Sequence, residues 1–223
     1  MKLLVTGGAG YIGSVVTSLL VDAGHNVAVL DDLSTGHAEA VPAGATFVRG
    51  RVHDEIADVL TPEYEGVLHF AAFIAAGESV QKPEIYWENN AFGTLKLLDA
   101  MRNAGVRRLV FSSTANVYGD PDSVPIPETA AVRPPNPYAT SKLDEMMPGP
   151  IAGSVEILAE LRARGTLLCS QEFYYVLKNF SPETFPATFR MLRFPALVSA
   201  VWDFGRSWGH HGGRAPCLLA TAS

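Results

Sequence analysis

Short apolar runs alternate with amphipathic stretches along the first two thirds of the chain. The runs Lys2–Thr6 and Asn26–Leu30 are short and largely apolar, as is typical of strands buried on both faces of a sheet. Between them, Tyr11–Ala23 carries apolar side chains at helical spacing and is followed by Gly24, a residue that commonly ends helices. The pattern predicts a strand, a helix and a second, parallel strand.

The alternation continues as far as residue 112. We expect strands at Thr46–Val48, Gly66–Phe70 and Arg108–Ser112, a short helix at Asp54–Leu60 and a long helix at Pro83–Ala104. Apolar strands separated by amphipathic helices predict a doubly wound α/β fold, in which helices cover both faces of a parallel sheet. The expected strand order is 3-2-1-4-5.

The composition fits one domain, or one and a fraction, because the chain has 223 residues, of which 48% are hydrophobic. The net charge of −6 argues against a dedicated nucleic-acid or anionic-membrane binder, since both need a basic surface. The two cysteines are too few for a disulfide framework or a metal cluster. Met1–Thr6 is unlike a signal peptide. A cytoplasmic enzyme without a bound metal is therefore expected.

Charge and aromatic residues are distributed unevenly along the chain. Residues 1–145 hold 10 Lys and Arg against 18 Asp and Glu, a net charge of −8, whereas residues 146–223 hold 7 against 5, a net charge of +2. Both cysteines and two of the three tryptophans also lie in the last third. The shift indicates a second structural unit or a segment of different origin.

Gly7, Gly10 and Gly13 lie between the first strand and its helix, where the phosphates of a dinucleotide would bind. Glycine permits a tight turn and lets the backbone approach a pyrophosphate, and the helix N-terminus offers free N–H groups and a positive dipole. Asp31 ends the next strand, where a carboxylate accepts hydrogen bonds from ribose hydroxyls and repels a 2′-phosphate. This placement favours NAD over NADP. The alternative is a glycine-rich turn followed by a solvated Asp31.

A second candidate cluster follows the last predicted strand of this region. Ser112, Ser113 and Thr114 supply hydroxyl groups, and Tyr138 precedes Lys142 by four residues, which places both on one face of a helix. An ammonium near a phenol favours the phenolate, which is a base at neutral pH. Tyr138 could then remove the proton of a substrate alcohol that Thr114 or a neighbouring serine orients, while hydride passes to a nicotinamide.

Together these segments resemble the extended short-chain dehydrogenase/reductase superfamily and, within it, the UDP-glucose 4-epimerases. The resemblance covers residues 1–145, and the Gly-Glu-Ser-Val and Asn-Asn stretches are the parts most specific to the epimerases. The segments that carry it are Val5–Gly13, His69–Ala72, Gly77–Val80, Lys82-Pro83, Glu88–Asn90, Gly93-Thr94, Phe111–Gly119 and Asn136–Tyr138.

The resemblance implies an enzyme that keeps NAD tightly bound and interconverts UDP-glucose and UDP-galactose. C4 of the hexose is oxidised to a ketone, the sugar turns over, and the hydride returns to its other face. The implied catalytic residues are Thr114, Tyr138 and Lys142. The implied cofactor-binding residues are Gly7, Gly10, Tyr11, Ile12, Gly13, Asp31, Phe70, Ala71, Asn89, Ser112, Tyr138 and Lys142. Family members often dimerise through two long helices, here Pro83–Ala104 and the helix that begins near Tyr138.

Two positions depart from the pattern of the family. Many members carry a lysine that contacts the cofactor where this chain has the uncharged stretch Phe73–Ala76, and Arg51 replaces an acidic residue near the adenine. Both changes could weaken NAD binding. His69 belongs to a matching segment, and we expect a hydrogen-bonded core residue there rather than a base.

The resemblance ends after Glu145. Pro148 and Pro150 are expected to end the helix early, because proline removes a donor and clashes with the preceding turn. A helix at Ser154–Arg164 and a sixth strand at Thr166–Ser170 are expected beyond them.

The predicted NAD-binding domain spans residues 1–170. Residues 171–223 contain no recognisable nucleotide-sugar domain and are interpreted as a divergent, poorly structured tail. That tail is either genuine or the product of a reading-frame change.

Three functions stay open from the sequence. The first is NAD-dependent epimerisation of a UDP-sugar, which the catalytic trio and the epimerase-like segments favour. The second is a truncated, catalytically inert fragment that binds NAD, since the substrate domain is not recognisable. The third is a related dehydratase or reductase that acts on another nucleotide sugar.

Overall fold

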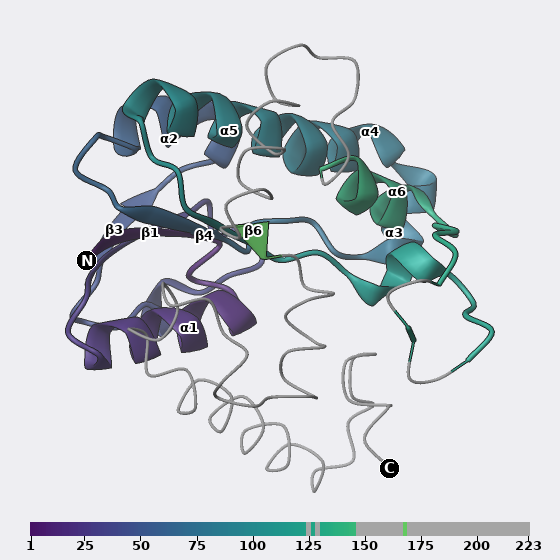
Figure 1. The fold of residues 1–223 in the computed structure, drawn as a ribbon, viewed down its shortest axis with the longest axis horizontal. Coiled ribbons are helices and arrows are strands. Elements are labelled where there is room, and N and C mark those ends of the chain that lie inside the picture. The colour runs from purple at the N-terminus through teal and green to yellow at the C-terminus, as the bar shows by residue number, and fades with distance from the viewer. Residues whose placement is uncertain (124–125, 128–129, 146–166, 169–223) are drawn as a thin grey trace, which may run out of the picture.

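Six strands form a parallel sheet in the computed structural model, which describes residues 1–123, 126–127, 130–145 and 167–168 (Figure 1). The order across the sheet is β3-β2-β1-β4-β5-β6. This confirms the doubly wound α/β fold and the expected strand order, with the sixth strand inside Thr166–Ser170. The strands are β1 Lys2–Thr6, β2 Asn26–Asp31, β3 Thr46–Arg49, β4 Gly66–His69, β5 Leu109–Phe111 and β6 Leu167–Leu168.

Helices cover both faces of this sheet. α2 and α5 lie on one face and α1 lies on the other (Figure 1). The helices are α1 Tyr11–Asp22, α2 Val52–Val59, α3 Ala76–Gln81, α4 Pro83–Tyr86, α5 Gly93–Ala104 and α6 Pro137–Asp144, with the 3-10 helices η1 Ala38–Ala40 and η3 Ala115–Tyr118 and the π-helix η2 Trp87–Phe92.

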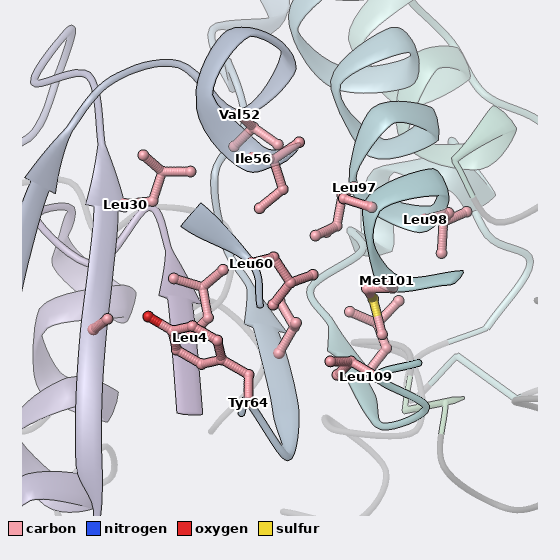
Figure 2. Packing of buried hydrophobic residues seen from close by; sticks show 14 of the residues in the cluster. Leu4, Leu30, Val52, Ile56, Leu60, Tyr64, Leu97, Leu98, Met101 and Leu109 are labelled. Atoms are coloured by element: carbon pink, nitrogen blue, oxygen red, sulfur yellow. The ribbon is translucent and has the colours of Figure 1, made fainter. Parts of the chain in front are cut away.

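Alternate side chains of the central strands enter two separate cores. Leu4 and Leu30 pack with Leu97 on the α2 and α5 side (Figure 2). Val5 packs with Val16 on the α1 side. Burying one such side chain contributes roughly 1.5–3 kcal/mol. The sheet is thus held from both faces, and the strands cannot slip by one residue without exchanging the two sets of side chains.

The carboxyl ends of the central strands meet at one edge of the sheet. In the strand register, Thr6 lies opposite both Leu30 and His69, and His69 lies opposite Phe111. The chain passes from β1 to β2 on one side, while β4 lies on the other side of β1. Doubly wound sheets bind their ligands at such a switch point. The candidate residues follow these strand ends.

The segment expected to be one long helix, Pro83–Ala104, is interrupted by the π-helix η2. Within η2, Asn90 is fully buried. Its side chain accepts a hydrogen bond from the Phe73 N–H at 2.8 Å and donates to the Phe73 carbonyl and the Ser141 hydroxyl, both at 3.0 Å. Hydrophobic spacing does not reveal these tertiary contacts, which accompany the change of helical type.

Replacing Asn90 with Ala is expected to lower the free energy of unfolding by about 2–4 kcal/mol, because the polar groups of Phe73 and Ser141 lose their buried partner. Urea denaturation measures the change. Asn89→Ala is the matched control, since the half-buried Asn89 side chain donates one bond, to Asn90. If the two variants lose equal stability, Asn90 does not hold these segments together.

Several expectations lie outside the described residues. These are the helix at Ser154–Arg164, the effect of Pro148 and Pro150, and the tail at 171–223. In the described part, α6 ends at Asp144.

Candidate functional site

The turn between β1 and α1 is so tightly packed that a side chain would not fit at two of its glycines. Gly7 has a φ of +73°, and a Cβ there would lie 2.5 Å from the backbone nitrogen of Ala71. A Cβ at Gly13 would overlap the carbonyl oxygen of Gly7. The Gly7 N–H donates to the Leu30 carbonyl at 2.9 Å. The turn is therefore pressed against both the end of β2 and the segment after β4.

The N-terminus of α1 faces outward at this turn. A Cβ at Gly10 would meet the Gly7 carbonyl oxygen at 3.3 Å, which is a tight but not an overlapping contact. Tyr11 and Ile12 are 60% and 39% exposed. The first residues of the helix, Tyr-Ile-Gly-Ser, carry no acidic side chain. The positive end of the helix dipole is thus left available to an anion such as a phosphate.

The carboxylate of Asp31 is buried beside the turn. Its Oδ2 accepts the Ala9 N–H at 3.0 Å and its Oδ1 accepts the Leu33 N–H at 2.8 Å. Leu33 has a φ of +61°, a conformation that costs energy in a non-glycine residue and that the carboxylate helps to hold. Each carboxylate oxygen can accept a further bond. Asp31 is therefore a fixed acceptor that fits ribose hydroxyls, rather than a freely solvated side chain.

The two positions that depart from the family pattern are at the edges of this site. Arg51, directly before α2, has its Nε 3.6 Å from Oδ2 of Asp32. In the uncharged stretch Phe73–Ala76, Ile74 is largely exposed. Their expected effect on NAD affinity stays a prediction.

Contacts made by three residues fix the position of Tyr138 at the start of α6. The Asn136 side chain caps this helix by accepting the Ala139 N–H at 2.9 Å, as Asn commonly does at an N-cap. The Tyr138 N–H donates to the Ser79 hydroxyl at 3.1 Å, and the tyrosine ring meets the ring of Tyr86 edge-on with centroids 6.4 Å apart. The cap and these contacts fix the backbone and the ring of Tyr138.

Opposing effects act on the pKa of the Tyr138 phenol. Burial raises its pKa, a hydrogen bond with the Thr114 side chain lowers it, and the negative charge of Glu145 raises it. Thr114 is itself held at the start of η3, where its Oγ1 accepts the Asn116 N–H at 3.2 Å. The structure thus brings Thr114 and Tyr138 together. Their catalytic roles stay predictions.

Lys142 lies one turn further along α6, and its side chain is 3% exposed. The sequence predicted its ammonium beside the phenol. In the structure its ion-pair partner is Glu145, with Nζ and Oε2 2.9 Å apart, and Nζ lies 4.4 Å from the centroid of the Phe111 ring. Glu145 is a near partner because a residue three positions after Lys142 shares its helical face. The approach of the ammonium to the phenol stays a prediction.

A buried row of polar side chains runs from β1 to Glu145. His69 Nδ1 is hydrogen-bonded to the Thr6 hydroxyl at 2.5 Å, and Nε2 to the Thr94 hydroxyl at 3.0 Å. Thr94 in turn donates to Oε2 of Glu145 at 3.1 Å. Burial, and secondly the charge of Lys142, lower the pKa of His69 to about 3. His69 is therefore neutral near pH 7, which confirms the prediction of a hydrogen-bonded core residue.

The remaining predicted residues are placed around these two clusters. Ser112 follows β5, and its N–H donates to the His69 carbonyl at 3.1 Å. Phe70 and Ala71 follow β4 and lie against Gly7. Asn89 is half-buried in η2. The structure thus brings Ser112, Phe70 and Ala71 to the carboxyl edge of the sheet. The contacts of all four residues with a cofactor stay predictions.

Glu145 and Thr94 were missed as members of the site. The signal for Glu145 was available in the sequence, because an acidic residue three positions after Lys142 lies on the same helical face. Thr94 carried no such signal, since α5 and α6 meet only in the folded chain.

Among the described residues, no group of three or more His, Cys, Asp and Glu side chains is placed to hold a metal ion. None of the described helices is both long and apolar enough to cross a membrane.

Residues 3–144 match the model of the NAD dependent epimerase/dehydratase family. A UDP-glucose 4-epimerase of Streptomyces lividans is 58% identical over 159 residues, which are 68% of this chain and 48% of that protein. A UDP-glucose 4-epimerase of Corynebacterium glutamicum is 54% identical over 144 residues, or 64% and 44% of the two chains. The chain thus spans about half the length of the curated relatives it matches.

Solved structures of UDP-glucose 4-epimerases also resemble this chain over about half of their own length. A UDP-glucose 4-epimerase from Brucella ovis in complex with NAD superposes with a TM-score of 0.63 at 38% identity, covering 75% of this chain and 50% of that one. A UDP-glucose 4-epimerase from Thermotoga maritima with UDP-glucose superposes with a TM-score of 0.65 at 33% identity, covering 76% and 54%.

Proposed function

Because the chain belongs to the NAD dependent epimerase/dehydratase family, we propose that it binds NAD and epimerises a UDP-sugar at C4, interconverting UDP-glucose and UDP-galactose. The observation that carries this proposal is the contact between Thr114 and Tyr138, one helical turn from Lys142, at the sheet edge that also holds the glycine turn. The identity to UDP-glucose 4-epimerases supports the choice of reaction and substrate.

The residues around the β1–α1 turn fit a dinucleotide. The α1 N-terminus offers N–H groups to a pyrophosphate, and the buried carboxylate of Asp31 offers acceptors to ribose hydroxyls. The residues that would hold the cofactor are Gly7, Gly10, Tyr11, Ile12, Gly13, Asp31, Phe70, Ala71, Asn89, Ser112, Tyr138 and Lys142.

Tyr138 acts as the general base in this proposal. Thr114 orients the C4 hydroxyl of the sugar, and the Tyr138 phenolate removes its proton, while Lys142 supplies positive charge that favours the phenolate. Bound NAD would supply the acceptor for the C4 hydride and the donor for its return to the opposite face of the ketone. Tyr138 then gives its proton back to the C4 oxygen, so that the residue and the cofactor both end as they began.

The chain is expected to bind NAD more tightly than NADP, because the Asp31 carboxylate repels a 2′-phosphate. Asp31→Asn removes the charge but keeps an oxygen, and it is expected to weaken NAD binding by roughly 10–100-fold, the value of one hydrogen bond to a charged group. Isothermal titration of both cofactors measures this. Asp32→Asn is the matched control, and equal losses in the two variants would contradict the role of Asp31.

Product analysis tests the reaction itself. The full chain with NAD is incubated separately with UDP-galactose and with other UDP-, GDP- and dTDP-sugars. Conversion of UDP-galactose to UDP-glucose supports the epimerase. A dehydrated or reduced product from another nucleotide sugar would identify the related dehydratase or reductase, and NAD binding without any product would identify the inert fragment.

The proposal extends to the organisation of the chain. A domain over residues 1–170 is supported by β6, which pairs with β5 inside these bounds. A cytoplasmic location and a homodimer formed through the α4–α5 segment and α6 are further proposals.

A further inference from the structure

Glu145 is a buried carboxylate for which the proposed reaction has no use. Its side chain has no exposed surface. Oε2 accepts hydrogen bonds from the Lys142 ammonium at 2.9 Å and from the Thr94 hydroxyl at 3.1 Å, while Oε1 has no hydrogen-bond partner among the residues that the structure describes. A buried carboxylate is costly unless a cation compensates it. Lys142 is that cation.

Along the row of polar side chains that ends at Glu145, every hydrogen bond is donated in the same direction. Thr94 gives its single hydroxyl proton to Glu145, so His69 must donate from Nε2 to the Thr94 oxygen. Since His69 is neutral, its Nδ1 accepts from the Thr6 hydroxyl. Every donor in the row thus points toward Glu145, which fixes Oε2 in place and with it the position of the Lys142 ammonium.

Glu145 and Lys142 act on Tyr138 with opposite signs. The negative charge of Glu145 raises the pKa of Tyr138. In the proposed function the Lys142 ammonium, four residues after Tyr138 on α6, acts in the opposite direction and favours the phenolate. Burial raises the pKa of Glu145, and the hydrogen bonds and charge of Lys142 and the bond from Thr94 oppose that rise. Lys142 and Glu145 pair at this point, with the Phe111 ring beneath the ammonium. The titratable His69, whose pKa the charge of Lys142 helps to lower, joins them through Thr94.

We propose that Glu145 is a positioning residue that holds Lys142 in a buried ion pair and thereby weakens the support that Lys142 gives to the Tyr138 phenolate. This rests on the proposed function, which assigns Tyr138 as the base. Glu145 touches neither substrate nor cofactor in this account. It determines the pH at which the tyrosine becomes competent to take a proton.

The test is the titration of Tyr138 in the full chain without cofactor. Tyrosine labelled with carbon-13 at Cζ reports phenol and phenolate by NMR, and the signal that disappears in Tyr138→Phe is that of Tyr138. In Glu145→Gln, which removes the charge and keeps an oxygen, the titration is expected to move to lower pH. In Glu145→Asp, which keeps the charge, it is expected to stay nearer to that of the unchanged protein.

The matched control is Asp99→Asn. Asp99 pairs with Arg102 at the same three-residue spacing on α5, but both side chains are half exposed and belong to the solvent face. This variant is expected to leave the Tyr138 titration unmoved, so that any shift in Glu145→Gln belongs to the buried pair and not to a general change in charge.

A failure to fold and a failure of the proposed function can each be distinguished from a failure of this proposal. If Glu145→Gln does not fold, Glu145→Met removes the charge and the unpartnered Oε1 with an apolar side chain of similar length, and the same shift is expected. A folded variant of either kind in which Tyr138 titrates as before would overturn the proposal. A shift in titration in a chain that neither binds NAD nor converts UDP-galactose would uphold the role of Glu145 and contradict the proposed function.

Discussion

Replacing Tyr138 with Phe is expected to lower the rate of UDP-galactose conversion by about 10²–10⁴-fold, the usual contribution of one general acid–base group. The variant keeps the ring that meets Tyr86 and the backbone N–H that donates to Ser79, so α6 should begin as before. The phenol oxygen alone is lost. The loss is therefore expected mainly in kcat. NAD affinity should fall much less, because the other residues proposed to hold the cofactor are unchanged. Steady-state kinetics and titration with NAD measure the two quantities.

Tyr64→Phe is the control for this substitution. Tyr64 is similarly buried, but it precedes β4 and so lies at the opposite, amino-terminal edge of the sheet (Figure 2). Removing its hydroxyl is expected to leave kcat unchanged. Equal rates in Tyr138→Phe and in the unchanged chain would show that another group takes the proton.

Replacing Gly13 with Ala is expected to lower the free energy of unfolding by roughly 1–3 kcal/mol, the typical cost of overpacking. The added Cβ overlaps the Gly7 carbonyl oxygen, which is backbone and cannot swing aside as a side chain would. Relief requires that the turn move away from α1. The turn is the proposed pyrophosphate site, so thermal stabilisation by NAD is expected to be lost together with stability. Thermal unfolding with and without NAD measures both effects.

Gly77→Ala provides the comparison. Gly77 lies in α3, where a Cβ would meet nothing within 4 Å, and the substitution is expected to be neutral or to stabilise by about 0.4–1 kcal/mol. NAD should stabilise this variant as it does the unchanged chain. If Gly13→Ala also keeps its full stabilisation by NAD, the cofactor does not bind at the β1–α1 turn.

The sheet could be predicted from the sequence because its strands are buried on both faces. Each of the first five strands follows the expected range to within one residue at either end. Continuous apolar runs separated by helical spacing are the signature of such a sheet. The expected strand order, 3-2-1-4-5, is the usual order of a doubly wound sheet.

The elements that depend on polar tertiary contacts could not be predicted. The helix α3 has few apolar positions, and its Ser79 is buried because it accepts the Tyr138 N–H from α6. The π-helix η2 accompanies the burial of Asn90, which bonds to Phe73 and Ser141. Each of these partners is distant in sequence, so the local spacing of apolar residues does not predict the contact.

The candidate site was predicted in part. The glycine turn and Asp31 could be recognised from residue type and spacing. Glycine is required where the backbone turns tightly, and a carboxylate after the second strand is suited to bind ribose hydroxyls. Thr114 and Tyr138 could be named as candidates from the hydroxyl residues after the last strand and from the spacing of Tyr138 and Lys142. Their mutual contact is a finding of the structure. The ion pair between Lys142 and Glu145 differs from the sequence prediction, in which the spacing of Tyr138 and Lys142 offers the phenol as the neighbour of the ammonium. Both Tyr138 and Glu145 lie within one turn of Lys142, and spacing alone does not choose between them.

The most direct test of the central claim is the transient reduction of NAD bound to the full chain. The chain is loaded with NAD and mixed rapidly with UDP-galactose, and the absorbance of reduced nicotinamide is followed while UDP-glucose is measured. The account predicts that reduced nicotinamide forms, returns to the oxidised state as product accumulates, and does not form in Tyr138→Phe. Bound NAD that stays oxidised, with UDP-galactose unchanged, would contradict it.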